Sequence, residues 1–409
     1  MDLTLLFFIA GSIILVGFLG DIIYEKIKIP DILVLIGIGI LLGPVFKLVD
    51  HRHLTEFAEY FGTFALIVIL FEGGMDIKIK MLLKELGNAT LLVAVSFIST
   101  TAAITAFLLY ARSWELLPSL LMATVLGCTS AAIVLPVLSK MSLKDETKTL
   151  LYVESAMSDV LAVVLAISLI EFFKLENIGI ERPFRTIASS FSIAIIAGVA
   201  FGLFWYKALT VMANRKYSYM VTLGVMLIVV ATVDFLGGSG PIAVLIFGII
   251  LGNCGDIPHL QASAQCTLID ETIKFFHGEV TFFIRTFFFV YLGMLITVEA
   301  LAQRNLVVSF SLLAIIVIMR YLSVEFMTRR TGKDKEEKTA LFYMLPRGLA
   351  TAVLASLPVA AGIEGSERFV VYAVSVIILT NIVMTIGVLH LERKKVNHAK
   401  KNVVSKTVS

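Results

Sequence analysis

The feature that most constrains this chain is a long succession of apolar stretches separated by short polar segments. A helix of about 20 apolar residues is long enough to cross the hydrocarbon core of a bilayer. The alternation of apolar and polar residues typical of a membrane barrel is absent. We therefore expect an all-α polytopic membrane protein with about 13 transmembrane helices, at residues 3–23, 30–47, 56–76, 88–110, 118–140, 149–172, 186–206, 218–236, 240–252, 274–298, 304–326, 338–361 and 367–390.

The composition excludes a water-soluble fold for most of the chain. Of the 409 residues, 58% are hydrophobic and only 16% are charged, whereas soluble domains carry about 25% charged residues. We therefore expect membrane lipids to surround the chain. The net charge of +3 gives no indication of a nucleic-acid partner, and no cofactor motif is visible.

The distribution of basic residues predicts the orientation. With the N-terminus outside, the inner loops and the C-terminal tail hold 23 Lys and Arg residues, and the outer loops hold 8. Because cytoplasmic loops are enriched in basic residues, we expect an external N-terminus and a cytoplasmic C-terminus in the plasma membrane. Residues 1–391 form the expected transmembrane domain, and 392–409 a short basic cytoplasmic tail that meets anionic headgroups.

Two spans share a pattern that suggests an internal repeat. The fifth span contains TSAAIVLP (129–136) and the twelfth contains TAVLASLP (351–358), each with Thr and Pro seven residues apart. An odd helix count suits two inverted six-helix repeats joined by a linking helix, and transporter sites are typically built from broken helices at such positions. We expect both spans to be broken crossing helices; the alternative is a Pro-kinked packing helix.

Six ionisable residues are placed inside predicted spans, where each costs about 2.5–3.5 kcal/mol on insertion scales. Such charges persist when they are paired or face a water-filled cavity. Three acids and three arginines suggest that most are paired. Glu72 and Arg320 could either form structural ion pairs or line a water-filled funnel. The six residues are Glu72, Glu154, Asp159, Arg285, Arg320 and Arg347.

Asp159 is the strongest candidate for a functional group. Ser155 and Asp159 share one helix face at i, i+4, and Glu154 and Ser158 form the adjacent row. Oxygen ligands of this kind suit a small hard cation. A desolvated carboxylate also takes up a proton near neutral pH, so Asp159 could hold either a proton or a cation.

The fifth span supplies further oxygens. Thr129 and Ser130 lie seven and six residues before Pro136, respectively, among small residues. A helix that unwinds there frees carbonyl groups for ion coordination. The expected cation and proton site therefore comprises Asp159, Ser155, Thr129, Ser158 and Ser130.

These residues resemble motifs of the monovalent cation:proton antiporter family. ESAMSD (154–159) is similar to its Glu-Ser-x-x-Asn-Asp motif, and TSAAIVLPVL (129–138) to its unwound crossing helix. FFIRTFFFVYLGM (282–294), LPRGLATAVLA (345–355) and FEGGMDI (71–77) resemble its tenth, twelfth and third helices. The resemblance covers the whole chain, with all five motifs in the family's order.

The resemblance implies a homodimer of thirteen-helix protomers, each with a dimerisation domain and a six-helix core that moves to alternate access. Asp159 becomes the carboxylate that binds the ion and the proton, and Thr129 and Ser155 become coordinating oxygens of a monovalent cation site. Glu154 becomes a buried acid that bridges to Arg347 or Arg285.

Two positions depart from the pattern of sodium-transporting members. Ser158 stands where most members have Asn or a second Asp, and Thr129-Ser130-Ala131 resembles potassium-efflux members rather than Thr-Asp-Pro. Sodium, potassium and lithium therefore all remain open as the cation. With only Asp159 left to titrate, we expect electroneutral 1:1 exchange with protons.

Two other functional classes compete with exchange. A membrane-embedded hydrolase of the aspartyl type needs two aspartates that share a site, and only Asp159 is a deep mid-span Asp. A passive channel would not need a titratable carboxylate inside the ion site. We therefore expect a transporter rather than an enzyme.

Overall fold

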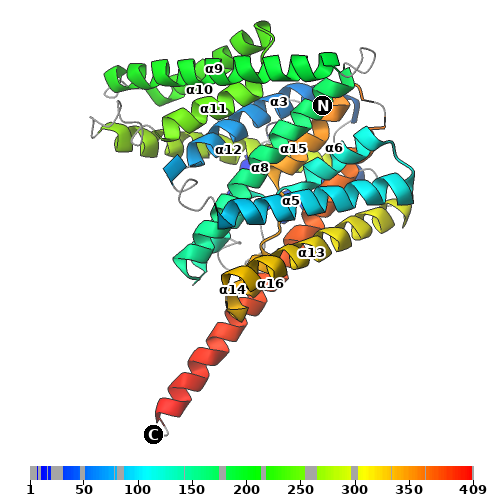
Figure 1. Ribbon diagram of the computed structural model, residues 1–409, viewed down its shortest axis with the longest axis vertical. Helices are drawn as coiled ribbons and strands as arrows, with labels where there is room; N and C mark the ends of the chain where they lie inside the picture. The colour runs from blue at the N-terminus through cyan, green and yellow to red at the C-terminus, as the bar shows by residue number, and fades with distance from the viewer. Residues whose placement is uncertain are drawn as a thin grey trace.

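The computed structural model describes residues 31–46, 51–77, 79–80, 87–141, 143–174, 181–212, 218–253, 265–295, 303–332, 334–363 and 365–407, with residues 7, 11–15 and 17–19. Most of the predicted span 3–23 therefore lies outside the described residues. The described elements are all helices, which confirms the predicted all-α class (Figure 1). In chain order they are α2 (Asp31–Ile40), η1 (Leu41–Val45), α3 (His51–Asp76), α5 (Asn88–Ala106), η2 (Phe107–Ala111), α6 (Leu116–Gly127), α7 (Ala131–Lys140), α8 (Asp145–Lys174), α9 (Glu181–Met212), α10 (Ser218–Phe235), α11 (Gly240–Gly252), α12 (Gln265–Leu295), α13 (Gln303–Thr331), α14 (Lys335–Tyr343), α15 (Leu349–Ala360) and α16 (Glu367–Thr407).

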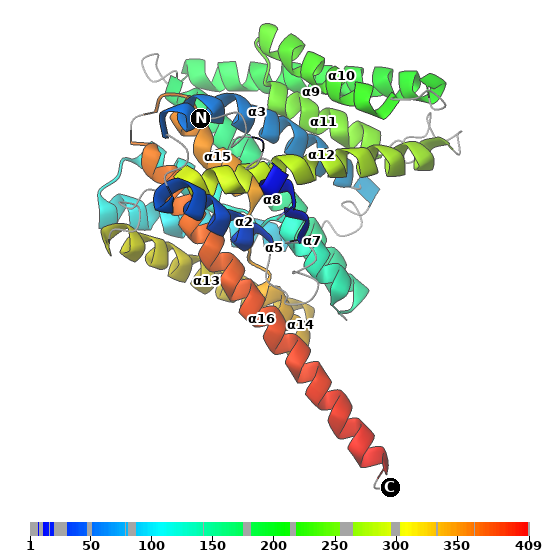
Figure 2. The ribbon, with the colours of Figure 1, turned by 180° about the vertical axis from the view of Figure 1, so that it is seen from behind.

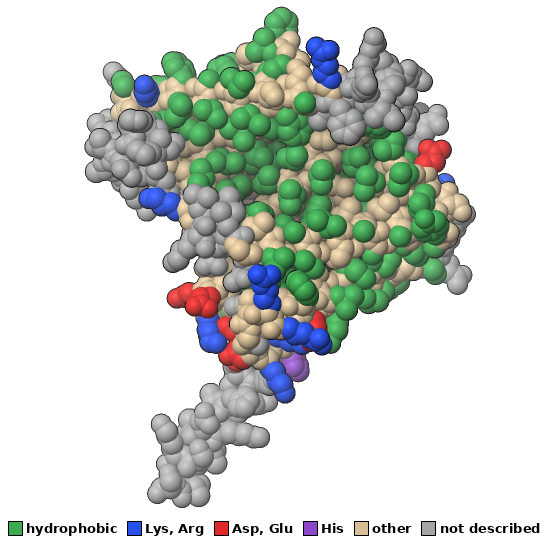
Figure 3. All heavy atoms as spheres, in the orientation of Figure 1, with side chains coloured by type: hydrophobic (Ala, Val, Ile, Leu, Met, Phe, Trp, Pro, Cys, Tyr) green, Lys and Arg blue, Asp and Glu red, His purple; other side chains and the backbone are tan. Residues whose placement is uncertain are grey.

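The outer surface is that of a membrane protein. Large apolar side chains such as Phe204, Ile228 and Phe310 are more than half exposed. Figure 3 shows apolar side chains over the middle of one face, with charged ones clustered at its lower end and others along its upper and side edges. By length and composition, the described part of the chain contains candidate membrane spans at Ala89–Ala111, Leu116–Val134, Asp145–Phe173, Ala188–Met212, Asn305–Thr331 and Arg368–Leu391. Shorter apolar helices accompany them, and the chain is a multi-pass membrane protein.

The helices pack as two groups. The scaffold group consists of α2, α3, α9, α10, α11 and α12, and the crossing group consists of α5, α6, α7, α8, α13, α14, α15 and α16. Figures 1 and 2 show α9–α11 at one side of the molecule and α13 with α16 at the other. The seam between the groups is formed mainly where α3 packs against α15, with smaller contacts of α8 with α9 and α3.

Glycines hold the scaffold group at close range. Gly74 of α3 and Gly248 of α11 lie where the two helices cross, and a methyl group on either would overlap a backbone carbonyl oxygen of the other helix. Gly39 of α2 and Gly293 of α12 make a similar crossing. Close backbone approach of this kind supports tight helix packing in membranes, where apolar burial alone gives little driving force.

The crossing group contains two broken helices, as the paired Thr and Pro pattern predicted. Helix α6 ends at Gly127 and α7 begins at Ala131, and the connecting residues Cys128 and Ser130 have extended backbones. Helix α14 ends at Tyr343 and α15 begins at Leu349. Four helix ends therefore meet inside the protein, each with unpaired backbone groups.

The two unwound segments cross in direct contact. The backbone N–H of Ser130 donates to the carbonyl oxygen of Pro346 at 2.9 Å. Gly348 lies against the side chains of Ser130 and Ile133, where a Cβ atom would be 2.8 Å from the nearest carbon atom of each. The crossing therefore requires a residue without a side chain at position 348.

The C-terminal end of the chain continues α16 without a break. The helix runs from Glu367 to Thr407, and its last part projects beyond the helical bundle (Figure 2). The expected tail, 392–409, is thus helical as far as residue 407.

Candidate ion site

Asp159 lies at the point where the first broken helix restarts. Its Oδ2 atom accepts a hydrogen bond of 3.1 Å from the backbone N–H of Ala131, the first residue of α7. A helix N-terminus favours a negative charge because its first N–H groups are unpaired and its dipole is positive there. The Oδ1 atom is buried and accepts no hydrogen bond from the described residues.

Three residues with hydroxyl groups lie on α8 and on the unwound segment next to Asp159, namely Ser155, Ser158 and Thr129. The backbone N–H of Thr129 donates to Ser158 Oγ at 3.1 Å, and Ser158 in turn donates to the Ser155 carbonyl oxygen at 3.0 Å. Ser155 Oγ is buried without a hydrogen-bond partner among the described residues. The structure therefore places the predicted residues Asp159, Ser155, Thr129 and Ser158 in one region, where one carboxylate oxygen and one hydroxyl have no hydrogen-bond partner among the residues described.

Ser130 lies between the candidate site and the second unwound segment. It caps the start of α7, and its side chain packs against Gly348 of the second unwound segment. Ser130 also lines the cavity described below, together with Asp159. Ser130 is therefore close to Asp159, but its described contacts are with Pro346 and Gly348 of the second unwound segment.

Glu154 is paired with Arg320, not with Arg347 or Arg285 as the resemblance implied. The two guanidinium nitrogens of Arg320 donate to the two oxygens of Glu154 at 2.5 and 2.9 Å. Arg320 Nε also donates to the Leu341 carbonyl oxygen at 3.0 Å, and Thr129 Oγ1 donates to Glu154 at 3.2 Å. Both side chains are at most 3% exposed. Because Thr129 contacts Glu154 as well as Ser158, the ion pair directly supports the candidate site.

Arg347 donates its described hydrogen bonds to backbone carbonyl groups and not to Glu154. Its Nε donates to the Leu126 carbonyl oxygen at 2.9 Å, and its NH1 group to the Leu345 carbonyl oxygen at 2.7 Å. These carbonyl groups lie at the end of α6 and in the second unwound segment. Arg347 therefore satisfies backbone groups that the helix breaks leave without partners.

A polar pair on α16, which the sequence analysis missed, holds the second crossing. Thr380 Oγ1 accepts the backbone N–H of Arg347 at 3.1 Å, and Asn381 Nδ2 donates to the Arg347 carbonyl oxygen at 2.9 Å. Both residues are completely buried. The signal that could have identified them is two adjacent polar residues inside the apolar span 367–390.

A cavity of about 300 Å³ reaches the candidate site through the seam between the two helix groups. Asp159, Ser130 and Ala131 line it from the crossing group, and Glu72 and Arg285 from the scaffold group. Glu72 and Arg285 thus belong to the wall of the cavity. Asp76 and Tyr152 also line the cavity, and the sequence analysis did not single them out.

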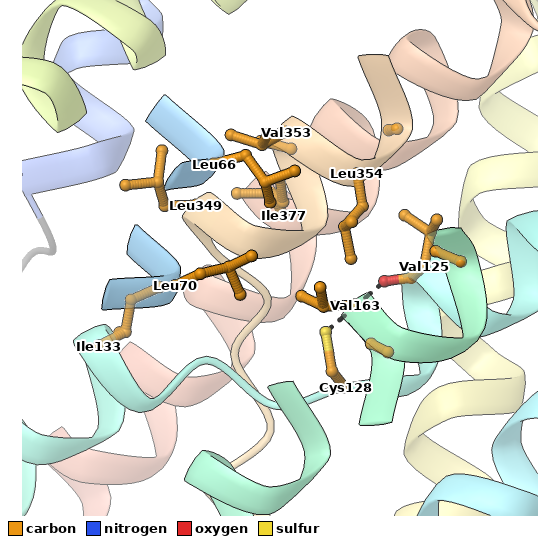
Figure 4. Close-up of a cluster of buried hydrophobic side chains, with 14 of the residues drawn as sticks. Leu66, Leu70, Val125, Cys128, Ile133, Val163, Leu349, Val353, Leu354 and Ile377 are labelled. Carbon is orange, nitrogen blue, oxygen red and sulfur yellow. Dashed lines mark hydrogen bonds between the residues drawn. The ribbon is translucent and has the colours of Figure 1, made fainter. Parts of the chain in front are cut away.

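An apolar cluster closes the seam beside the cavity. Figure 4 shows Leu66 and Leu70 of α3 next to Leu349 and Val353 of α15, with Cys128 of the first unwound segment nearby. The Cys128 thiol donates to the Val125 carbonyl oxygen at 3.7 Å. Water and ions have no polar partners in such a cluster, which therefore acts as a barrier.

A polar clasp joins the chain before α8 to the start of α14. Lys144 Nζ lies 2.9 Å from Asp334 and 3.4 Å from the buried Glu337, which also accepts a 3.0 Å hydrogen bond from Thr147. The hydrogen bond with Asp334 raises the pKa of Lys144, and the same bond lowers the pKa of Asp334. The clasp ties the two broken helices together at one end of the molecule.

Hard oxygen atoms dominate the candidate site. Among the described residues, no group of three or more His, Cys, Asp and Glu side chains could hold a metal ion. A monovalent cation, which accepts hydroxyl, carbonyl and carboxylate oxygens, is the ligand that these residues fit best.

The comparisons with known proteins point to one family. The family model described as "Sodium/hydrogen exchanger, transmembrane" matches residues 11–391. The K(+)/H(+) antiporter NhaP2 of Shewanella oneidensis is 28% identical over 394 residues, which cover 92% of this chain and 65% of that protein. The chain thus corresponds to slightly less than two thirds of the length of that relative.

A second relative and a solved structure are similar over nearly their whole lengths. The Na(+)/H(+) antiporter 1 of Methanocaldococcus jannaschii is 26% identical over 376 residues, covering 89% of this chain and 85% of that protein. The solved structure of the sodium proton antiporter MjNhaP1 from the same organism superposes with a TM-score of 0.78 at 22% identity. It covers 96% of this chain and 99% of the other, and shows that the two share a fold.

Proposed function

We propose, from the membership of this chain in the sodium/hydrogen exchanger family, that it is a secondary transporter that exchanges a monovalent cation for protons by alternating access. Curated relatives are named as Na(+)/H(+) and K(+)/H(+) antiporters. The observation that carries the proposal is the buried Oδ1 atom of Asp159, which has no hydrogen-bond partner among the described residues, in a carboxylate that lines the cavity beside the first helix break.

In this proposal Asp159 binds either the proton or the cation. Ser155 Oγ and Thr129 Oγ1 complete the cation's coordination, and Ser158 positions Thr129 through its hydrogen bonds. Ser130 contributes by fixing the start of α7. The N-terminus of α7 stabilises the ionised carboxylate after the proton has left.

The remaining buried charges are structural in this proposal. Glu154 and Arg320 neutralise each other, and Arg347 satisfies carbonyl groups at the crossing. Glu72 and Arg285 belong to the wall of the cavity. None of these groups then changes its charge during transport.

Electroneutral 1:1 exchange follows from this assignment. Arginine stays protonated in proteins, so Arg285 cannot carry a second proton as a desolvated lysine could. Asp159 with a proton and Asp159 with a bound monovalent cation have the same net charge. The empty ionised site differs by one charge and crosses poorly, which couples the two fluxes.

The architecture supports alternating access. We propose thirteen transmembrane helices in two inverted six-helix repeats, with α6–α7 and α14–α15 as the two broken crossing helices. The scaffold group would carry the homodimer contact, and the crossing group would move against it. The N-terminus would lie outside and the basic tail in the cytoplasm, in a plasma membrane.

The cation is sodium in this proposal, with lithium and potassium as alternatives. Ser158 and Ser130 keep the potassium alternative open, because both lie where a second carboxylate or amide would add negative potential for a small ion. A membrane-embedded hydrolase is disfavoured because Asp159 has no second aspartate within its described hydrogen bonds.

Reconstitution into liposomes with a trapped pH dye tests the function. Addition of sodium, lithium and potassium in turn should give saturable alkalinisation or acidification that reverses with the proton gradient, and the Asp159→Asn variant should give none. Cation flux without proton movement would instead indicate a channel. With valinomycin and potassium setting the voltage, sodium-driven proton flux should not depend on the potential; a several-fold change on clamping would refute 1:1 exchange.

A further inference from the structure

A hydrogen bond crosses the seam between the two helix groups at the edge of the cavity. The hydroxyl of Tyr152, on α8, donates to the backbone carbonyl oxygen of Asp76, the last residue of α3. Helix α8 carries Asp159, whereas α3 belongs to the scaffold group. Both residues line the cavity that leads to Asp159.

The acceptor is rigidly held. Buried Asn253, which follows α11, donates to the carbonyl oxygens of Ile77 and Ile249 at 2.6 and 2.8 Å and accepts the N–H of Ile79 at 2.8 Å. These bonds fasten the chain just beyond α3 to α11. Asp76 therefore presents its carbonyl oxygen from a fixed part of the scaffold group.

The donor is on the same helix face as the ion-binding residue. Tyr152 and Asp159 are seven residues apart, and Ala156 and Val160 lie on the same face and also line the cavity. A shift of α8 along or across α3 would carry Asp159 and the Tyr152 hydroxyl together. The hydrogen bond thus cannot survive a movement of the crossing group that takes Asp159 away from this cavity.

We infer that Tyr152 is a positioning residue that latches the crossing group to the scaffold group in the arrangement in which Asp159 faces this cavity. The latch would have to break each time the ion site moves to the other side of the membrane, and to reform on return. This inference rests on the proposed exchange function for its effect on transport, but its effect on conformation stands independently.

The expected effect follows from the value of one hydrogen bond. A net hydrogen bond changes an equilibrium by roughly two- to tenfold, so Tyr152→Phe should shift the balance between the two arrangements by that factor. A ligand that binds only one arrangement has an apparent affinity reduced by the fraction that is competent. The ratio of sodium affinities on the two sides of the membrane should therefore change, with weaker binding from the cavity side and tighter binding from the opposite side.

Two cysteine reporters measure the conformation without transport. Ala132 is exposed and lines the cavity, whereas Val353 is fully buried in the apolar cluster of the seam. In a background with Cys128, Cys254 and Cys266 replaced, Tyr152→Phe should slow maleimide labelling of Ala132→Cys or speed labelling of Val353→Cys, by roughly two- to tenfold. If the arrangement that faces this cavity is the less populated one, the Ala132→Cys labelling rate should fall; if the opposite arrangement is the less populated one, the Val353→Cys labelling rate should rise.

Tyr110→Phe is the matched control, because it removes a tyrosine hydroxyl that is far from the seam in an exposed position. It should change neither the labelling rates nor the affinity ratio. Unchanged labelling of both reporters in Tyr152→Phe, with an unchanged affinity ratio, would overturn the latch. If wild-type protein gives no exchange but labelling shifts as expected, the latch stands and the proposed function fails; active exchange with unshifted labelling refutes the latch alone.

Discussion

The buried pair of Glu154 and Arg320 gives the sharpest stability prediction. Each group is nearly inaccessible to solvent, and they share two hydrogen bonds. Removal of one partner of a buried pair costs about 3–5 kcal/mol, because the remaining charge is left without compensation. Glu154→Ala also removes the acceptor of the Thr129 hydroxyl, so its cost should lie toward the upper end of this range.

Asp159→Asn is the matched comparison on the same helix, because it also removes a buried carboxylate. Its oxygen can still accept the N–H of Ala131, and the lost Oδ1 atom had no hydrogen-bond partner among the described residues. We therefore expect little loss of stability, despite a complete loss of exchange.

A double-mutant cycle separates the pair from its surroundings. The double variant Glu154→Leu with Arg320→Met replaces both charges by apolar groups and should recover much of the stability that either single variant loses. The coupling between the two sites should exceed about 2 kcal/mol, near the top of the range for residues in contact.

Unfolding in mixed micelles with increasing SDS, followed by the fluorescence of Trp114 and Trp205, gives the required free energies of unfolding. Equal stability of Glu154→Ala and Asp159→Asn would contradict the assignment of Glu154 as structural. A coupling near zero would show that the ion pair does not form in the membrane-embedded protein.

The remaining predictions concern the site, the crossing and the clasp. Ser155→Ala should raise the KM for the cation several-fold with little change in melting temperature, since the Ser155 hydroxyl has no described partner to lose; an unchanged KM would remove Ser155 from the coordination shell. Gly348→Ala should lower the melting temperature and exchange together, because the new methyl group overlaps Ser130, whereas Gly73→Ala, with open space around its Cβ position, serves as the control and should retain stability. Glu337→Gln should destabilise the protein more than Asp334→Asn, because Glu337 is buried and accepts from Thr147 while Asp334 is exposed; the reverse order in thermal unfolding would contradict this. Since the pKa of Asp334 is lowered in the folded protein, its contribution is complete above the ordinary Asp value of about 3.9 and is lost as the pH falls below it, so wild type should lose stability in acid relative to Asp334→Asn.

The sequence was sufficient to predict the class of the fold and to select candidate residues for the site. The apolar stretches gave the all-α membrane architecture because lipid leaves few alternatives to helices. The matched Thr and Pro positions identified spans five and twelve as the broken ones. The breaks themselves precede the prolines, because Pro136 lies inside α7 and Pro358 inside α15. The i, i+4 spacing of Ser155 and Asp159 predicted that both lie on one face of a helix; in the structure both are on α8, and Asp159 lines the cavity.

The sequence did not reveal which groups meet across helices. Tyr152 and Asp76 were not singled out, because a tyrosine near a helix end and a backbone carbonyl group carry no sequence signal for each other. The partner of Glu154 could not be read either, since Arg285, Arg320 and Arg347 all lie within apolar spans and differ only in the rotation and packing of their helices.

One physical consideration would have favoured Arg320 as the partner. A break inside the membrane creates carbonyl groups without donors, and an arginine within the broken segment is the nearest group able to satisfy several of them. Arg347 is adjacent to Gly348 in such a segment, and its described donors are used for the carbonyl oxygens of Leu126 and Leu345. Arg320 lies on the unbroken helix α13; it gives its Nε to the Leu341 carbonyl oxygen and keeps both terminal nitrogens for the carboxylate of Glu154. In a chain with broken helices, donors for the unpaired backbone carbonyl groups should therefore be identified before side-chain ion pairs are predicted. An unsatisfied carbonyl group in a dry interior is as costly as a polar side chain without a partner.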